Sequence, residues 1–315
     1  MTAPVRTVFL GSGQFGVAAL RRLAALPQSE LVGLVTAPPR PAGRAGRPRP
    51  TPIDVVAAEL GVEPVLRPER LRSPEAIEGV FRLDPELAVL ADYGQIVPPP
   101  LLGLPRGALN LHPSLLPRHR GASPIPATIL AGDRETGVTL MQMDAGLDTG
   151  PLVAQRRLAL SGAESAPELE ASLSALAAEL LAEALPQWLT GRLPARPQPA
   201  EGATLTRSLR RADGRLDPAR PAAELERQVR AYQPWPGSFV ETPFGRLVVW
   251  RARVLPGDSP VDPGTLVPPA GDGGLALATV DGLLDILEAQ PAGGRRLPVD
   301  ELLRGRPGLV GSLVG

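Results

Sequence analysis

Three side chains of this 315-residue chain are suited to act together on a carbonyl group. Asn110 and His112, one of only two histidines, are separated by a single residue in an apolar stretch. Positions i and i+2 of a β-strand face the same way, so both side chains would point into one cleft. An amide and an imidazole can donate hydrogen bonds to an oxyanion, and the carboxylate of Asp148 can bias the imidazole's protonation or carry a proton. We expect these three residues, the trio, to serve a reaction that builds negative charge on a carbonyl oxygen.

The first half of the chain alternates short apolar strands with helical stretches, which predicts a parallel sheet covered by helices. The predicted strands are Val5–Leu10, Leu31–Thr36, Leu87–Leu90, Ala108–Leu111 and Val138–Met141. The predicted helices are Gln14–Ala25, Ile53–Leu60, Pro74–Arg82, Pro124–Ala131 and Ala166–Thr190. Asn110 would then lie on the fourth strand, with His112 just beyond it.

The character of the sequence changes after residue 190. Gly191–Gly202 is rich in proline and glycine and has no periodicity, which predicts a linker at 191–203 between a catalytic domain, 1–190, and a second domain, 204–315. The second domain begins with a helix near Ala222–Ala231. Short strands separated by turn residues follow it, a spacing typical of a small β-barrel. They are Gly237–Glu241, Arg246–Val254, Gly264–Val267, Leu275–Ala278 and Leu283–Ala289.

Composition excludes several functional classes. The formal net charge is +0, so any nucleic-acid contact must come from local patches rather than from the whole molecule. The chain has no cysteine, which excludes disulfides, cysteine-ligated zinc and a thiol nucleophile. No apolar run approaches the roughly 18 residues that span a membrane, and the N-terminus does not resemble a signal peptide. We expect a soluble, cytoplasmic protein.

Gly11-Ser-Gly-Gln-Phe-Gly16 matches the G-x-G-x-x-G pattern of dinucleotide-binding proteins, between a strand and a helix. That fingerprint also requires an acidic residue about 20 positions later, to bind the ribose. Thr36-Ala-Pro-Pro39 occupies that place, although Arg40 could bind a 2′-phosphate. An NADP-dependent oxidoreductase therefore stays open as an alternative, and a tight strand–helix turn is the favoured interpretation.

Two further features have simple interpretations. Asp148-Thr-Gly150 matches the catalytic triplet of aspartic proteases, but those enzymes need two aspartates that share a proton, and the chain has one triplet. His119 lies between Arg118 and Arg120 in a polar loop, so we expect it at the surface.

Arginines gather in two places. Four of them, with no acid between, lie in a Gly/Pro-rich loop at Arg40, Arg44, Arg47 and Arg49. Contact with phosphates or an RNA groove and a mobile, solvated loop are equally good interpretations of this loop. A second cluster stands where the linker ends, at Arg207, Arg210, Arg211 and Arg215, and a solvated face is favoured there.

The runs that carry the trio resemble the formyltransferases that use 10-formyltetrahydrofolate. The resemblance rests on Asn110-x-His-x-Ser-Leu-Leu-Pro-x-x-Arg-Gly121, Ala131-Gly-Asp-x-Glu-Thr-Gly-Val138 and Met141-Gln-Met-Asp-x-Gly-Leu-Asp-Thr-Gly150. It extends to Arg40-Pro-Ala-Gly-Arg44, Tyr93-Gly-x-Ile-x-Pro98, Pro234-Trp-Pro236 and Gln290-Pro-Ala-Gly293, and so covers nearly the whole chain. The matches in the second domain are typical of the branch that formylates methionyl-initiator tRNA, rather than of the formyltransferases of purine synthesis.

The resemblance implies an α/β fold, with a Rossmann-like parallel sheet in the N-terminal domain and an OB-like β-barrel in the C-terminal domain. It implies that Asn110, His112 and Asp148 are catalytic. The residues implied to bind the folate co-substrate are Tyr93, Gly94, Ile96, Ser114, Leu115, Leu116, Pro117 and Asp144. Those implied to bind the tRNA acceptor arm are Arg40, Arg44, Arg47, Arg49, Arg207, Arg210 and Arg211. A monomer without a metal is expected.

The sequence departs from this family at two positions that bear on the pocket and the tRNA. Ser208 stands where lysine is frequent, and Asp92 stands where a small residue is usual. The trio is intact.

The implied reaction is direct transfer, without a covalent enzyme intermediate. The neutral α-amine of the tRNA-bound methionine attacks the formyl carbon on N10 of the folate. The oxyanion is held by the Asn110 amide and by His112 in its protonated form, and Asp148 favours that imidazolium and relays the proton. Two different activities stay open beside this one: a sugar-nucleotide formyltransferase with the same trio, and a tRNA-binding protein without catalysis.

Overall fold

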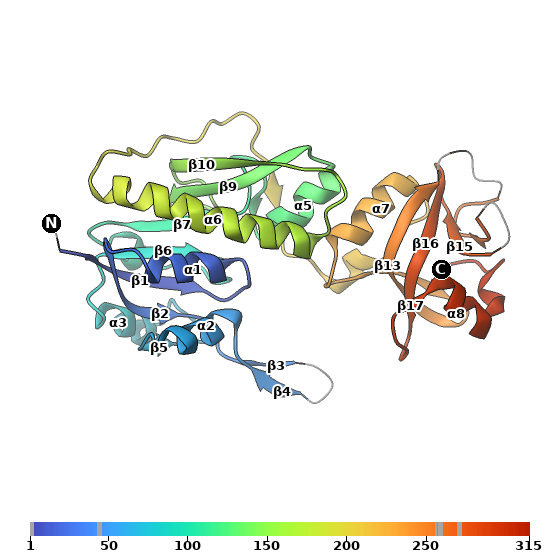
Figure 1. Cartoon of the computed structure of the whole chain (residues 1–315), viewed down its shortest axis with the longest axis horizontal. Coiled ribbons are helices and arrows are strands. Elements are labelled where there is room, and N and C mark those ends of the chain that lie inside the picture. The colour runs from blue at the N-terminus through green and yellow to red at the C-terminus, as the bar shows by residue number, and fades with distance from the viewer. Residues whose placement is uncertain (1–2, 43–45, 256, 258–260, 270–272) are drawn as a thin grey trace. The chain divides into compact units, whose positions relative to one another are not determined.

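The computed structural model describes residues 3–42, 46–255, 257, 261–269 and 273–315 (Figure 1). The chain forms two compact units. The first contains residues 1–124, 135–159 and 169–207, and the second contains residues 125–134, 160–168 and 208–315. The predicted linker at 191–203 thus falls within the first unit. The domain boundaries set at residues 190 and 203 stay a prediction.

The first unit is built on a seven-stranded sheet in the order β10–β9–β7–β6–β1–β2–β5. The strands are β1 (Val5–Gly11), β2 (Ser29–Val35), β5 (Val65–Leu66), β6 (Leu87–Ala91), β7 (Ala108–His112), β9 (Glu135–Gln142) and β10 (Leu152–Ala159). From β7 to β5 all neighbours are parallel, which confirms the Rossmann-like fold. One edge of the sheet departs from the parallel arrangement, because β9 runs antiparallel to β7 and forms a hairpin with β10.

Strand β6 is apolar along its whole length because both faces of the sheet are covered. Every residue of β6 is buried. The helices from β1 to the end of α6 are α1 (Gly16–Ala24), α2 (Pro52–Leu60), α3 (Pro74–Phe81), α4 (Pro99–Leu102), α5 (Pro124–Ala131) and α6 (Ala166–Leu189). Residues 125–131 of α5 and 166–168 of α6 belong to the second unit. Local signals set their starts: Thr51 and Asp54 form a capping box on α2, and Ser73 caps α3. Ser174 of α6 donates a hydrogen bond to the carbonyl of Phe15 (2.8 Å), which fixes α6 beside α1.

The glycine-rich turn after β1 serves packing. The backbone N–H groups of Ser12 and Gly13 both donate to the carbonyl of Asp92, at 3.0 and 3.4 Å. A Cβ atom on Gly11 or Gly16 would lie within 2.8 Å of the Ala91 carbonyl oxygen. The N–H groups that would hold a pyrophosphate are therefore used within the protein, which favours the tight turn over dinucleotide binding.

The second unit contains a curled antiparallel sheet in the order β12–β13–β16–β15–β14, with β17 beside β16, consistent with an OB-like half-barrel. Its elements are η1 (Arg211–Gly214), α7 (Ala222–Ala231), β12 (Ser238–Thr242), β13 (Gly245–Leu255), β14 (Leu266–Val267), β15 (Leu275–Ala278), β16 (Leu283–Pro291), β17 (Leu297–Pro298), α8 (Val299–Gly305) and η2 (Pro307–Leu309). Leu225 of α7 and Leu284 of β16 belong to one buried core. The five predicted strands and the helix are confirmed, whereas α8 and β17 were not predicted.

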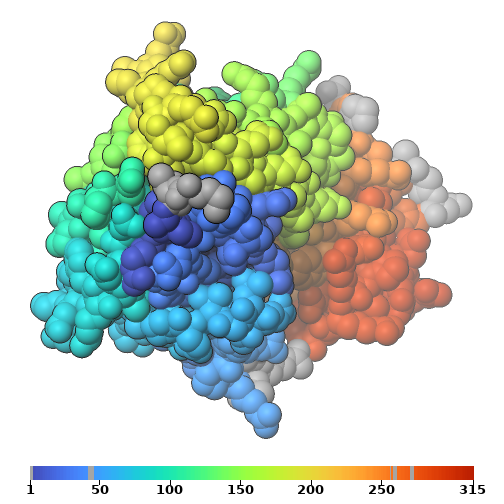
Figure 2. Space-filling model, turned by 60° about the vertical axis from the view of Figure 1, so that its left-hand side comes forward, coloured from blue at the N-terminus to red at the C-terminus, as the bar shows by residue number. Residues whose placement is uncertain are grey.

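Two short ribbons occupy stretches expected to lack strands. β3 (Arg40–Ala42) and β4 (Arg47–Arg49) form an antiparallel hairpin that projects from the first unit (Figures 1 and 2). β8 (Arg120–Gly121) pairs in parallel with β11 (Leu205–Thr206). Within the residues that the structure describes, no helix has the length and apolar character needed to cross a membrane.

Candidate active site

Strand β7 carries two members of the trio. Asn110 lies between Leu90 of β6 and Met141 of β9, and His112 ends the strand opposite Thr139. The Asn110 side chain is half-buried and makes no hydrogen bond within the described part of the chain, so its amide is available to a ligand. His112 is buried, with 4% of its surface exposed. The predicted placement of both residues on one strand is confirmed.

The two ring nitrogens of His112 have different environments. Nε2 lies 2.9 Å from the carbonyl oxygen of His119. Because a carbonyl only accepts, Nε2 must carry a proton and donate it. Nδ1 faces Oδ2 of Asp148 at 3.7 Å. Nδ1 is therefore the nitrogen that can gain or lose a proton, and it does so beside a carboxylate.

Burial lowers the pKa of His112 below its ordinary value, while the negative charge of Asp148 and the hydrogen bond to the His119 carbonyl raise it in part. The charge of His119 lowers it further. The free site thus favours the neutral imidazole. The lowered pKa opposes the protonated His112 that the sequence led us to expect, and its role in the reaction stays a prediction.

Asp148 is held in an unusual backbone conformation. Its φ is 51°, in the left-handed region that side chains other than glycine seldom adopt. Oδ2 accepts a hydrogen bond from the backbone N–H of Gly121 (2.7 Å). This bond aims the carboxylate at His112. The structure thus brings Asp148 to His112 across a sequence separation of 36 residues, as His112 and Asp148 form a close pair.

The prediction for His119 is wrong. This residue is 7% exposed, not at the surface. Its N–H donates to Oγ1 of Thr204 (2.8 Å), and its carbonyl accepts from His112. The loop is covered by residues far along the chain, a long-range packing that the polar neighbours Arg118 and Arg120 do not reveal.

Gln198 is the functional candidate that the sequence did not indicate. Its Nε2 donates to the carbonyls of Asp148 (2.8 Å) and Gly150 (2.7 Å). Its Oε1 accepts from Nε and Nη2 of Arg120, at 3.1 and 2.7 Å. A lone glutamine in a Pro-rich stretch gave no signal beyond that of a linker.

Two of the residues implied to contact folate lie within the protein. Ser114 is buried, and its hydroxyl donates to the carbonyl of Arg118 (2.6 Å). Leu116 is also buried, and its N–H donates to Oγ1 of Thr139 (3.1 Å). Leu115 and Pro117 are half-buried. This segment is firmly placed next to His112, and its contact with folate stays a prediction.

The other implied folate residues lie in two loops. Tyr93 packs its side chain against a buried core of the first unit, and its hydroxyl has no partner there. Gly94 and Ile96 are exposed, the latter by 79%. Asp144 closes its own loop by accepting hydrogen bonds from the Thr149 hydroxyl (2.8 Å) and the Gly146 N–H (3.0 Å). Exposed isoleucine and an anchored aromatic residue are compatible with a flat, apolar ligand.

The arginines expected to meet tRNA fall into separate places. On the hairpin, Arg40 stands opposite Arg49, and Arg47 stands opposite Ala42. Opposed residues, and residues two apart, share a face of a ribbon, so these three exposed side chains form one arginine face. No ion pair to them is found among the described residues. Strands β6 and β1 lie between β2, which precedes the hairpin, and β7.

The other arginines expected to bind tRNA are Arg44, Arg207, Arg210 and Arg211. Arg44 lies outside the described residues. Arg207, Arg210 and Arg211 are exposed. Arg207 belongs to the first unit and the other two belong to the second.

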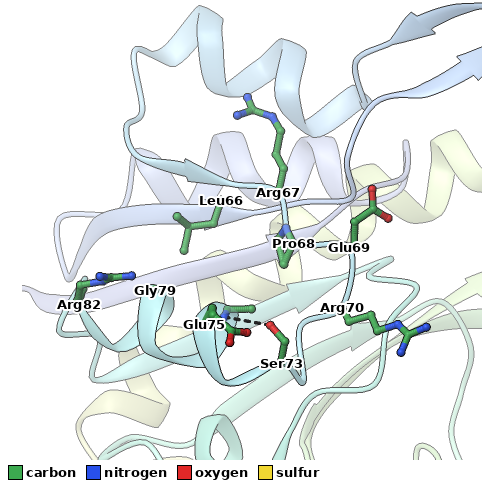
Figure 3. Close-up of a pocket in the computed structure, with 10 residues that line it drawn as sticks. Leu66, Arg67, Pro68, Glu69, Arg70, Ser73, Glu75, Gly79 and Arg82 are labelled. Carbon is green, nitrogen blue, oxygen red and sulfur yellow. Dashed lines mark hydrogen bonds between the residues drawn. The ribbon is translucent and has the colours of Figure 1, made fainter.

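A surface cavity of about 520 Å³ lies in the first unit beside β5 and α3, away from the trio (Figure 3). Arg67, Arg70 and Arg82 line it together with Glu69 and Glu75. Its lining thus carries charges of both signs, and it contains none of the trio. The described residues also contain no cluster of three or more side chains that could hold a metal ion.

Comparison of the sequence with known protein families agrees with this fold. The family model described as Formyl transferase matches residues 5–185, and the one described as Formyl transferase, C-terminal domain, matches residues 208–307. The chain belongs to the formyl transferase family.

This formyltransferase has close curated relatives. It is 42% identical over 302 residues to a methionyl-tRNA formyltransferase of Paracoccus denitrificans, covering 96% of this chain and 97% of the relative. It is 44% identical over 304 residues to a methionyl-tRNA formyltransferase of Roseiflexus, covering 96% of this chain and 93% of the relative.

Solved structures share the fold of the formyltransferase at lower identity. An N-formyltransferase from Helicobacter canadensis, in complex with folinic acid and dTDP-3-aminofucose, has a TM-score of 0.63 at 13% identity, and the likeness covers 93% of this chain and 100% of that chain. A methionyl-tRNA formyltransferase from Clostridium thermocellum has a TM-score of 0.54 at 18% identity, covering 79% of this chain and 93% of that one.

Proposed function

We propose that this formyltransferase moves the formyl group of 10-formyltetrahydrofolate to the α-amino group of methionyl-initiator tRNA. Relatives of that name match 96% of the chain. The observation that carries the chemistry is the pair formed by Nδ1 of His112 and Oδ2 of Asp148, 3.7 Å apart, beside the Asn110 amide, which makes no hydrogen bond within the described residues.

The pair is suited to take up the proton that the reaction releases. When the neutral amine attacks the formyl carbon, a C–N bond forms, the carbonyl π electrons move to oxygen, and the nitrogen becomes positively charged. A proton then leaves that nitrogen. Nδ1 can accept it, because Nε2 already donates to His119, and Asp148 stabilises the imidazolium that results. Collapse of the oxyanion breaks the bond to N10 of the folate, which regains a proton.

Asn110 is the proposed donor to the oxyanion. Among the described residues its amide has no hydrogen bond to lose when a ligand binds, and strand β7 fixes the position of its backbone between β6 and β9. A donor that is already in place costs no reorganisation when the charge develops. The imidazolium at Nδ1 becomes a second donor after the proton has moved.

The folate would lie along residues 114–117 and the two exposed loops at Ile96 and Asp144. Residues 114–117 adjoin His112 in the chain, and Ile96 follows β6, which runs parallel to β7. Ligands of open α/β sheets bind beyond the carboxyl ends of such parallel strands. Asp144 follows β9, which runs antiparallel to β7, and its loop leads to Asp148 beside His112. Structural relatives have been solved in complex with folinic acid and with tetrahydrofolic acid.

The arginine face supports a nucleic-acid acceptor. Two like charges placed directly opposite each other destabilise a ribbon unless an anion lies between them. A phosphate backbone supplies such anions, and Arg40, Arg47 and Arg49 present their guanidinium groups on one side. We propose that this face binds the acceptor arm, with the enzyme acting in the cytoplasm as a monomer. Sedimentation at working concentration tests the latter.

A substrate competition tests the function. The enzyme is given 10-formyltetrahydrofolate with initiator methionyl-tRNA, elongator methionyl-tRNA or an amino-sugar nucleotide. We expect rapid transfer to the initiator tRNA alone. Transfer to the sugar alone would overturn the proposal and assign the chain to the other acceptor class that the fold supports.

Replacement of Arg40, Arg47 and Arg49 by alanine together tests the arginine face. We expect KM for the tRNA to rise, KM for the folate to stay constant, and the salt dependence of tRNA binding to weaken by about one unit of slope for each lost phosphate contact. Alanine at Arg22, Arg72 and Arg192, which are exposed arginines of the same unit, provides the charge-matched control. Equal effects of the two triple variants would contradict a specific role of the hairpin.

A further inference from the structure

We propose that residues 196–206, which link the long helix α6 to the C-terminal unit, act as a positioning element that holds both members of the His112–Asp148 pair in register. This inference rests on the proposed role of the trio. The segment runs beside β10, where Arg196 exchanges backbone hydrogen bonds with Leu152 (2.7 and 2.8 Å), and ends in β11 (Figure 1).

Gln198 acts on Asp148. One amide nitrogen donates to two carbonyls, those of Asp148 and Gly150, on either side of Thr149. The turn they belong to includes the left-handed φ of Asp148, a conformation that persists only where surrounding contacts support it. The turn is also closely packed at Gly150, where no side chain fits, because a Cβ atom there would lie 1.9 Å from the Gln142 carbonyl oxygen.

The orientation of the Gln198 amide is determined by its partners. The carbonyls can only accept, and the guanidinium of Arg120 can only donate. The amide nitrogen must therefore face the turn, and the amide oxygen must face Arg120. An apolar or acidic side chain cannot replace both contacts.

Thr204 acts on His112 through one intermediate. Its hydroxyl accepts the N–H of His119, and its own carbonyl accepts the N–H of Arg120 (2.9 Å). These bonds fix the carbonyl of His119, which itself has a positive φ of 59°. That carbonyl accepts from Nε2 of His112 and so leaves Nδ1 to face Asp148.

Thr206 supports the loop that lies between the Gln198 contact and the Thr204 contact. Its Oγ1 accepts the N–H of Ser123 (3.0 Å) and donates to the carbonyl of Arg120 (3.0 Å). It thereby fixes β8 on both sides of Gly121, whose N–H donates to Asp148. Residues at 198, 204 and 206 thus reach His112 and Asp148 without touching a reacting atom.

Loss of these contacts should lower kcat, because the catalytic side chains move out of position. It should leave KM for the substrates nearly unchanged. Substituting groups that orient a functional side chain commonly costs about 10–100-fold in activity, and misplacement by about 1 Å can cost 10²-fold. The titratable groups that act on His112 are Asp148 and His119. If the Asp148 turn relaxes, its charge moves away from the imidazole, and the titration of His112 moves to lower pH.

The test compares Gln198→Leu with Gln187→Leu in the full-length enzyme. Gln187 is exposed on α6, and its side-chain amide donates to the Glu183 carbonyl, so the same chemical change is made away from the site. We expect Gln198→Leu to lower kcat about 10–100-fold with KM for both substrates close to wild type, and Gln187→Leu to be unaffected. Gln198→Glu keeps the contact with Arg120 and removes the two donors, and gives the same result if the leucine variant fails to fold.

Histidine NMR provides a measurement that would stay unchanged if Gln198 had a structural role alone. The chain has two histidines, and a His119→Asn variant assigns the two sets of ring resonances. We expect wild-type His112 to be protonated at Nε2, and its titration to move to lower pH in Gln198→Leu. Thr204→Val should increase the Nδ1-protonated tautomer, whereas Thr190→Val, at the exposed end of α6, should not.

Two results would overturn the proposal. One is a kcat of Gln198→Leu equal to that of Gln187→Leu. The other is a lower kcat with the tautomer and titration of His112 unchanged, which would leave Gln198 with a role in folding only. Asn110→Ala and Asp148→Asn distinguish this failure from that of the catalytic site: if they lose turnover while Gln198→Leu does not, only the positioning role is wrong.

Discussion

The two halves of the candidate site are held in different ways. Asn110 and His112 lie on β7, an inner strand whose position is set by backbone hydrogen bonds to β6 and β9. Asp148 lies in an irregular turn with a left-handed backbone, and side chains from residues 198–206 support that turn and the loop facing it. A strand needs no side chain of its own to hold a position. A turn does, because it has few backbone partners.

This contrast predicts which substitutions change turnover alone and which also change stability. On the strand, a functional side chain can be removed without disturbing the backbone that carried it. In the loops, the residues that hold the geometry also hold the local fold, so changes there should affect turnover and stability together.

Asn110→Ala should have the largest effect on turnover and none on folding. Loss of one oxyanion donor typically lowers kcat by about 10²–10³. The melting temperature should not change, because the Asn110 side chain makes no hydrogen bond within the described residues. Single-turnover formylation and thermal unfolding measure the two effects.

Asn110→Asp is the matched variant, since it keeps the shape and replaces the donor by an acceptor. We expect at least an equal loss of turnover. Near-normal turnover in either variant would show that Asn110 is not the donor.

Asp148→Asn tests the loop half of the pair. Asparagine can still accept the N–H of Gly121 through its oxygen, so the turn should persist, but the charge that stabilises the imidazolium is removed. We expect kcat to fall by about 10²-fold or more and the pKa of His112 to fall, because Asp148 raises it in the wild type. A pKa of His112 that stays constant would mean that the two groups do not interact.

Gly121→Ala should lower both turnover and stability. A Cβ atom there would lie 2.2 Å from the Thr206 carbonyl oxygen, at a φ of 106°, so β8 and β11 could not pair. Gly191→Ala is the control, because Gly191 also has a positive φ (71°) but has no atom within 4 Å of the new Cβ. Each pays the cost of the left-handed backbone, about 1–2 kcal/mol for a residue other than glycine.

The difference between these two variants isolates the contact between the loops. We expect a lower melting temperature and a lower kcat for Gly121→Ala than for Gly191→Ala. Identical values would indicate that the β8–β11 pairing does not support the site.

The smallest expected effect is the change in the free energy of unfolding with pH. The pKa of His112 is lowered in the folded protein, so between that value and about 6.5, the ordinary value, the unfolded chain binds more protons than the folded one. The contribution of His112 to the free energy of unfolding is complete above that window and is lost as the pH falls through it.

Activity should follow the same group, because Nδ1 must be unprotonated to accept the amine's proton. The acid limb of kcat/KM should lie below pH 6.5 and move to lower pH in Asp148→Asn. An acid limb above pH 6.5 would mean that the pKa of the group is raised, and a loss of activity as the pH rises through 6.5 would mean that the reaction requires the imidazolium at the start.

The sequence predicted the parts of the fold that local patterns determine. Alternating apolar strands and helical patterns predicted the inner strands of the sheet and the helices α1 to α3, and the i, i+2 spacing placed Asn110 and His112 on β7. The chemistry of the residues suggested Asp148 as their partner, and the family resemblance supported it. None of this required knowledge of contacts between distant residues.

What could not be predicted depends on such contacts. Gln198 and Thr204 meet the site across separations of 50 and 85 residues, from a stretch whose proline content resembles a linker. His119 is buried where Thr204 of that stretch accepts its N–H. The antiparallel edge formed by β9 and β10 likewise depends on which distant residues pair, since β9 lies beside β7 although other elements separate them in the chain.

The late position of β11 has a consequence for synthesis of the chain. A ribosome that has delivered residue 159 has produced every strand of the central sheet and the whole trio. The Gln198 and Thr204 contacts to Asp148 and His119 form only when residues 198–206 emerge, after the long helix α6. If the proposed positioning role is right, a nascent chain contains the whole trio well before it can reach full turnover, which requires nearly two-thirds of the chain.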